Sequence, residues 1–236
     1  MIEWLMNLEW DAIVQIIIID ILLGGDNAVI IALACRNLPP KHRRQGIFWG
    51  AAGAIVLRVI LITVAVALLE VPFLKLVGGL LLLWIGIKLL APPEEEGGPH
   101  GKVQASDKLL AAIKTIIIAD FVMSLDNVIA IAGAAEQADP SQRTGLIIFG
   151  LLVSVPFIVF GSQIILKLLD RYPIIILLGG ALLGWIAGGL IVTDPVAEPF
   201  VPQTDTVRYV ASAAGAAFVV AVAKLLARRR HKTSGA

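Results

Sequence analysis

The chain has 236 residues, of which 58% are hydrophobic and 16% charged, and its formal net charge is +1. Soluble domains carry roughly a quarter charged residues, so this composition excludes an ordinary soluble protein. The basic run at residues 228–232 is better explained as an anchor at anionic lipid headgroups than as a nucleic-acid site, so no nucleic-acid partner is expected.

Apolar stretches long enough to cross a bilayer, about 20 residues each, follow one another along the chain. They are continuously apolar, whereas the strands of a membrane barrel alternate with polar residues, so the pattern predicts helices. We therefore expect an all-α, polytopic membrane helical bundle. Its seven transmembrane helices are predicted at residues 12–34, 46–69, 72–90, 109–135, 145–169, 173–192 and 207–227.

A long polar segment, residues 91–107, divides this single transmembrane domain (residues 1–236) into two halves and is interpreted as a cytoplasmic linker. The halves share a motif. Asp20, followed by GDNAVI at residues 25–30, recurs one hundred residues later as Asp120, followed by LDNVIA at residues 125–130. The duplication predicts two three-helix repeats, at residues 12–90 and 109–192, with the seventh helix outside them. Because each repeat has an odd number of spans, the second copy enters the membrane from the opposite side, so the repeats are inverted.

Lysine and arginine are unevenly distributed over the two sides of this topology. Fourteen of them fall on the side of the linker and the C-terminus, and three fall on the other side. Positive residues are enriched on the cytoplasmic side of membrane proteins. The distribution predicts an N-terminus outside and a C-terminus in the cytoplasm.

Four aspartates lie within the apolar interiors of the first and fourth spans: Asp20, Asp26, Asp120 and Asp126. An isolated ionised carboxylate at the bilayer centre costs about 2.5–3.5 kcal/mol on insertion scales, so these groups need protons, basic partners or a bound cation. Two basic residues lie within spans. Of these, Arg58 is a candidate counter-charge for an empty site, or alternatively snorkels to the membrane interface.

The neighbours of the aspartates favour a hard cation. Asn27 and Asn127 each follow an aspartate and offer an amide oxygen, and Gly24-Gly25 could break the first helix and free carbonyl oxygens. In the second copy, Ser124 could bend the helix by bonding back to a carbonyl. The single cysteine and three histidines form no cluster for a soft metal. An all-oxygen set suits manganese(II), magnesium or calcium.

With both aspartate–asparagine motifs in view, the sequence resembles the TerC family, particularly its YjbE-like branch within the LysE-type transporter superfamily. The resemblance implies manganese(II) export across the bacterial cytoplasmic membrane and, more weakly, an association with tellurium resistance. It also implies a set of metal ligands, which are Asp20, Asp26, Asn27, Asp120, Asp126 and Asn127.

Three functions fit paired intramembrane aspartates: export of a divalent cation, intramembrane aspartyl proteolysis, and export of an amino acid or another cation. We favour the first, and so expect no enzyme activity and no prosthetic group. The metal is then the substrate, and protons are the expected coupling ion. A protease would resemble a Tyr-Asp plus Gly-x-Gly-Asp pattern, whereas Asp20 follows an isoleucine. An amino acid would need a basic or helix-terminus partner for its carboxylate, and the expected site is acidic. The sequence leaves open whether the chain forms a homodimer.

Overall fold

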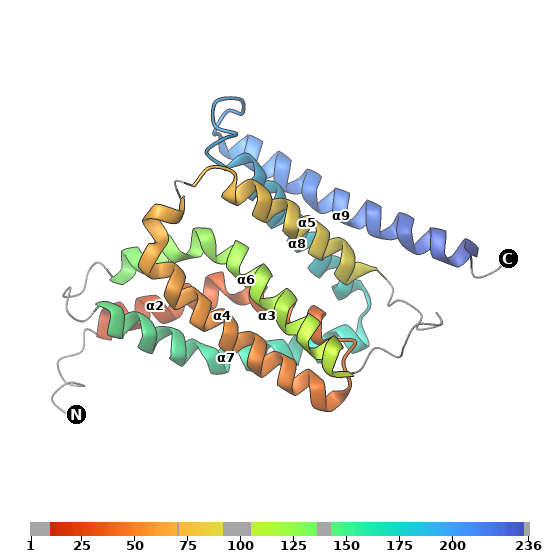
Figure 1. Ribbon diagram of the computed structural model, residues 1–236, viewed down its shortest axis with the longest axis horizontal. Helices are drawn as coiled ribbons and strands as arrows, with labels where there is room; N and C mark the ends of the chain where they lie inside the picture. The colour runs from red at the N-terminus through yellow and green to blue at the C-terminus, as the bar shows by residue number, and fades with distance from the viewer. Residues whose placement is uncertain (1–9, 70, 92–104, 136–142, 234–236) are drawn as a thin grey trace.

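The computed structural model describes residues 10–69, 71–91, 105–135 and 143–233, and all regular secondary structure within them is helical. Each predicted span coincides with a helix, except that the first is divided between two (Figure 1). Most of the predicted linker lies outside the described residues. The eight helices of the described residues are α2 (Trp10–Leu23), α3 (Gly25–Cys35), α4 (Pro40–Leu69), α5 (Leu74–Leu90), α6 (Ala105–Ala135), α7 (Arg143–Arg171), α8 (Ile174–Val192) and α9 (Asp205–Thr233).

Four helices, α4, α7, α8 and α9, are each long and apolar enough to cross a membrane, and α2 with α3 forms a fifth candidate that is bent by 48°. The remaining two helices, α5 with 17 residues and α6 with five charged residues, are not among these candidates. Large apolar side chains face outward, among them Leu22 (74% exposed) and Phe160 (66%). Such a surface suits contact with lipid.

The helices are arranged in two layers. Helices α5, α8 and α9 lie together along one side of the bundle, and α2, α3, α4, α6 and α7 form the other side (Figure 1). Two contacts in the second layer are related. A Cβ added to Gly50 would lie 2.6 Å from Ile116, and a Cβ added to Gly150 would lie 2.6 Å from Ile16. Both residues of the second contact differ by one hundred from those of the first.

Helix α9 is packed tightly onto α8 rather than standing apart. A Cβ on Gly188 would lie 2.1 Å from the main-chain oxygen of Ala211, and a Cβ on Gly184 would lie 2.4 Å from that of Gly215. No side chain could occupy either position, so the two backbones are in direct contact. Small residues permit such close approach in membranes, where van der Waals packing stabilises helix pairs.

Asp194 ties the loop after α8 to the start of α5 within this layer. Its buried carboxylate accepts hydrogen bonds from the N–H groups of Phe73 (3.1 Å), Leu76 (3.0 Å) and Val196 (2.9 Å). Phe73 itself has a left-handed backbone, with φ at 67°. Burial tends to raise the pKa of Asp194, but these main-chain donors outweigh burial and lower the pKa below its ordinary value. The carboxylate thus caps α5.

We expect this cap to make the stability of the protein depend on acidity. Because the pKa of Asp194 is lower in the folded state, its contribution is present above the unfolded pKa of about 3.9 and is lost as the pH falls through the folded value. Asp194→Asn should lower the free energy of unfolding by about 1.5–3 kcal/mol at neutral pH. Thermal unfolding in detergent across the acidic range measures this. Glu198→Gln, in the same loop and exposed, is the control, and equal effects of the two substitutions would contradict the cap.

Candidate metal site

The first predicted span is broken at Gly24, which lies between α2 and α3. A Cβ on Gly24 would lie 2.4 Å from the main-chain oxygen of Asp20, whereas a Cβ on Gly25 would meet nothing within 4 Å. Glycine is therefore required at the first position and is merely tolerated at the second. In contrast, α6 runs without a break through Ser124. The two matching segments thus differ in backbone conformation.

Asp20 on α2, Arg58 on α4 and Asp120 on α6 meet in a buried cluster, with 1%, 2% and 3% of their surfaces exposed. Arg58 donates from Nη1 to Asp20 Oδ1 and from Nη2 to Asp120 Oδ1 (2.7 Å). The guanidinium therefore bridges two carboxylates that lie one hundred residues apart in the sequence. Arginine suits this position because its planar fork of donors can serve two acceptors.

Two serine hydroxyls complete the cluster. Ser124 accepts a hydrogen bond from Arg58 Nε (3.2 Å) and donates to Asp120 Oδ2 (3.2 Å). Ser124 thus bonds to side chains instead of bending α6 through a carbonyl. Ser154 on α7 donates to Asp20 Oδ2. The sequence analysis did not single out Ser154, because one serine in an apolar span is also compatible with a bond to its own helix.

The cluster carries an unbalanced charge. Two carboxylates and one guanidinium sum to −1 if all three are ionised. Burying ionised groups is costly, and one partner of the opposite sign does not fully compensate two. The hydroxyls of Ser124 and Ser154 relieve part of this deficit through hydrogen bonds. The cluster therefore still favours additional positive charge.

Asp26 and Asn27 lie in the first turn of α3. Asp26 Oδ1 accepts a hydrogen bond from the main-chain N–H of Asn27 at 2.8 Å. Asn27 is 4% exposed, and neither its Oδ1 nor its Nδ2 has a hydrogen-bond partner. Buried polar side chains are nearly always hydrogen-bonded, so an unsatisfied amide beside a carboxylate is a candidate ligand group.

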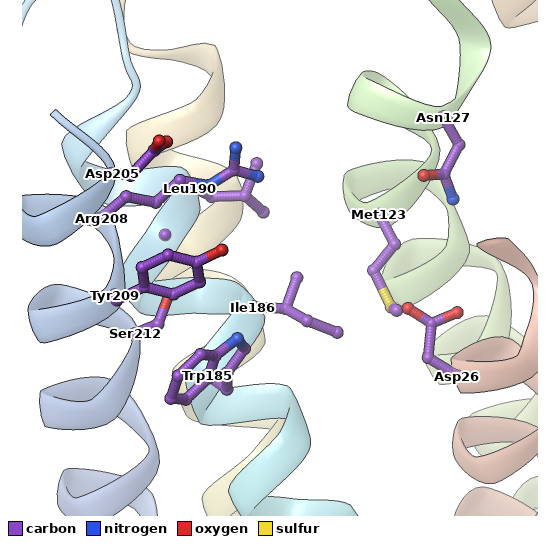
Figure 2. Close-up of a pocket in the computed structure, with 11 residues that line it drawn as sticks. Asp26, Met123, Asn127, Trp185, Ile186, Leu190, Asp205, Arg208, Tyr209 and Ser212 are labelled. Carbon is purple, nitrogen blue, oxygen red and sulfur yellow. The ribbon is translucent and has the colours of Figure 1, made fainter. Parts of the chain in front are cut away.

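Asp26 also faces a pocket of about 360 Å³ between the two layers. Figure 2 shows Asp26, Met123 and Asn127 on one wall, while the facing wall comes from α8 and α9. The facing wall carries polar groups of its own: Asp205, Arg208, Tyr209 and Ser212. The sequence analysis did not identify these α9 residues, because the seventh helix has no counterpart in the repeat.

Four of the six predicted ligands can be assigned to one of two neighbouring places, and Asn27 lies next to Asp26. Asp20 and Asp120 lie in the buried cluster, and Asp26 and Asn127 line the pocket. The side chain of Asp126, on α6, is outside the described residues. Among the residues that the structure describes, no three His, Cys, Asp or Glu side chains are close enough to hold a metal ion together. Carboxylates repel one another unless a cation lies between them. In this structure Arg58 lies between Asp20 and Asp120.

These features define a helical integral membrane protein that buries an Asp–Arg–Asp cluster where its helices cross. The chain belongs to the TerC family, described as an integral membrane protein family, whose model matches residues 6–232. No solved structure matches the chain.

The chain is similar to membrane proteins of Bacillus subtilis and Escherichia coli. The chain is 41% identical to the uncharacterized membrane protein YjbE of Bacillus subtilis (strain 168), over 90% of this chain and 95% of that protein. It is 25% identical to the uncharacterized membrane protein YceF of the same organism, over 70% of this chain and 64% of YceF. It is 27% identical to the UPF0053 inner membrane protein YgdQ of Escherichia coli (strain K12), over 70% of this chain and 73% of YgdQ.

Proposed function

We propose that this protein is a secondary transporter that exports a divalent metal ion, with manganese(II) as its principal cargo, across the cytoplasmic membrane. The observation that carries the proposal is the convergence of Asp20 and Asp120 at one buried point. These residues occupy matching positions in the two halves of the sequence. Intramembrane carboxylates that face the interior of a bundle typically mark an ion pathway.

The packing of the helices supports a repeated architecture. Helix α4 packs on α6, and α2 with α3 packs on α7, so exchanging the two halves maps one packing onto the other. The contacts of Gly50 with Ile116 and of Gly150 with Ile16 follow the same exchange. Helix α2 also begins at one end of the bundle and α9 ends at the other (Figure 1). We infer a 3+3 inverted repeat with one added helix, seven spans in all, which places substrate between the repeats.

The donor chemistry supports a hard divalent ion. Apart from the thioether of Met123 on the pocket wall, the groups available are carboxylates, the unpartnered amide of Asn27 and serine hydroxyls, which offer oxygen donors. Oxygen donors suit manganese(II), magnesium and calcium better than soft metals. The choice of manganese among these rests on the resemblance of the two Asp-Asn motifs to those of the TerC family.

A route for the ion follows from the pocket. With the N-terminus outside, the pocket opens to the outer side, since α9 begins there. Asp26 and Asn127 on its wall would then receive the ion from the buried cluster before release. The break at Gly24 places Asp26 in the first turn of α3, where the N–H of Asn27 holds one of its carboxylate oxygens. No nucleotide-binding motif occurs in the sequence, so we expect an ion gradient to supply the energy.

The geometry favours neither alternative function. An aspartyl protease needs two carboxylates that share a proton, but Arg58 lies between Asp20 and Asp120. An amino-acid exporter would need a basic group for the substrate carboxylate, and Arg58 does not supply one, because all three of its guanidinium nitrogens have partners within the protein. Arg208, on the wall of the pocket opposite Asp26, is the basic group that an amino acid would have to use.

Transport by inverted vesicles tests the proposal. Vesicles with the native protein should accumulate manganese(II), and Asp26→Asn and Asp126→Asn should each abolish uptake. Asp107→Asn is the matched control, because Asp107 is exposed and lies on the same helix as Asp126. Uptake by the native protein no faster than by vesicles without it would refute the function. Loss in one variant alone would show that the two halves contribute unequally.

A further inference from the structure

We propose that Arg58 is a tethered monovalent cation that occupies the ion position between Asp20 and Asp120, and so makes the site selective for divalent over monovalent ions. This inference rests on the proposed transport function. It assigns to Arg58 a specificity-determining role that a purely structural ion pair would not have.

The geometry places the guanidinium where a bridging ion would bind. Its two terminal nitrogens contact one carboxylate each, and its Nε contacts Ser124. An ion that binds both aspartates must therefore replace the terminal nitrogens of Arg58. Arginine can leave as a unit, because the guanidinium is carried on a flexible chain from α4.

The charge balance decides which ions can replace it. With Arg58 in place, the two carboxylates retain one net negative charge. A sodium or potassium ion in the same position would leave that same charge and would forfeit the hydrogen bonds of the guanidinium. A divalent ion neutralises both carboxylates. Only an ion of higher charge therefore gains electrostatic energy by displacing Arg58.

The cluster contains one tethered cation, because the second half of the chain has no arginine at the position that matches Arg58. The residue one hundred positions after Arg58 is Ile158, which is buried on α7 in the apolar core. On the side of α7, the polar group that contacts the cluster is the neutral hydroxyl of Ser154. Within the described residues, Arg58 is the partner in every ion pair of Asp20 and Asp120. The single charge of Arg58 thus occupies the position of one bound ion between Asp20 and Asp120.

Removing the tethered charge should therefore change both affinity and selectivity. A nearby opposite charge lowers the affinity of a carboxylate for a proton by about 1–3 logarithmic units, and the same electrostatic effect acts on a metal ion. Arg58→Gln should therefore bind manganese(II) about tenfold more tightly or better. Potassium should compete with manganese in Arg58→Gln. It should not compete in the native protein or in Arg58→Lys, which keeps a tethered charge.

The experiment is manganese(II) titration of the purified protein in detergent at mildly alkaline pH, where protons compete least. Potassium is exchanged for a large organic cation at constant ionic strength. Gel filtration and thermal unfolding establish that each variant is folded. Weaker or unchanged manganese binding by folded Arg58→Gln, with no competition by potassium, would overturn the inference and leave Arg58 as a structural ion pair.

The native protein alone provides a second test, which holds even if Arg58→Gln does not fold. If potassium competes with manganese in the native protein, the tethered charge does not confer selectivity and the inference is wrong. If the native protein binds no manganese at all, the proposed function itself fails. The two failures are thus distinguishable.

Discussion

Replacing Asp120 by asparagine is expected to abolish metal transport while leaving the protein folded and about as stable as the native form. The substitution removes one of the two buried carboxylates but retains an oxygen that can accept the hydrogen bond from Arg58 Nη2. Arg58 then has a single charged partner, Asp20, and the cluster becomes neutral. A neutral buried pair avoids the uncompensated charge that makes such clusters costly.

The loss of transport should be large. Removing even an outer-shell partner of a metal ligand costs about 10–100-fold in affinity, so loss of a carboxylate ligand should reduce manganese uptake by about a hundredfold or more. Uptake by proteoliposomes and thermal unfolding of the same preparation measure the two effects together. Asp20→Asn should behave alike, since the two residues hold equivalent nitrogens of Arg58.

Two results would contradict this account. Asp120→Asn that transports at the native rate would show that Asp120 is not a ligand. Asp120→Asn that unfolds readily would show that the cluster is primarily structural. Asp107→Asn, at an exposed position of the same helix, controls for the effect of an asparagine on α6.

Gly24→Ala is expected to have the second-largest effect, because the added Cβ would lie 2.4 Å from the main-chain oxygen of Asp20. That atom belongs to the backbone, so relief requires α2 or α3 to move, and the Asp20 carboxylate moves with it. Overpacking of this kind typically costs about 1–3 kcal/mol of stability. Manganese affinity should fall as well, since the carboxylate no longer faces Arg58 in the same way.

Gly25→Ala provides the matched control for this test. A Cβ at Gly25 would meet nothing within 4 Å, so the same chemical change one residue later should leave stability and manganese binding close to native. Thermal unfolding and manganese titration of the two variants, prepared in parallel, measure the difference. Equal behaviour of the two would show that the break between α2 and α3 tolerates side chains, and the argument from Gly24 would be wrong.

The linear pattern was sufficient to predict much of the architecture. Each helix of a membrane protein satisfies its own backbone hydrogen bonds and turns apolar side chains to lipid, so its position can be recognised from its own residues. The predicted spans accordingly coincide with α2 to α9. The same reasoning singled out Asp20 and Asp120, because a carboxylate in an apolar run is conspicuous without knowledge of its neighbours.

The surroundings of the break in the first span could not be predicted from the sequence. Gly24 and Gly25 were equivalent in the sequence, but one has a carbonyl against it and the other has open space. Ser124 was expected to bend α6, yet its hydroxyl contacts Arg58 and Asp120. A short polar side chain can bond to several groups, and the nearest one depends on which helix lies opposite.

Read alone, then, the sequence predicted a helical membrane protein with acids inside apolar spans of two similar segments, and the structure and the family confirm the helical membrane protein. Packing was needed to bring Arg58 of α4 between acids of α2 and α6, to place Asp26 on the pocket wall within electrostatic reach of Arg58 and Asp120, and to place α9 along the pocket. The physical reason is that helix positions depend on the local period and hydrophobicity of the sequence. The meeting of side chains depends on how helices far apart in the chain cross, and small residues such as Gly50, Gly150 and Gly188 set that crossing.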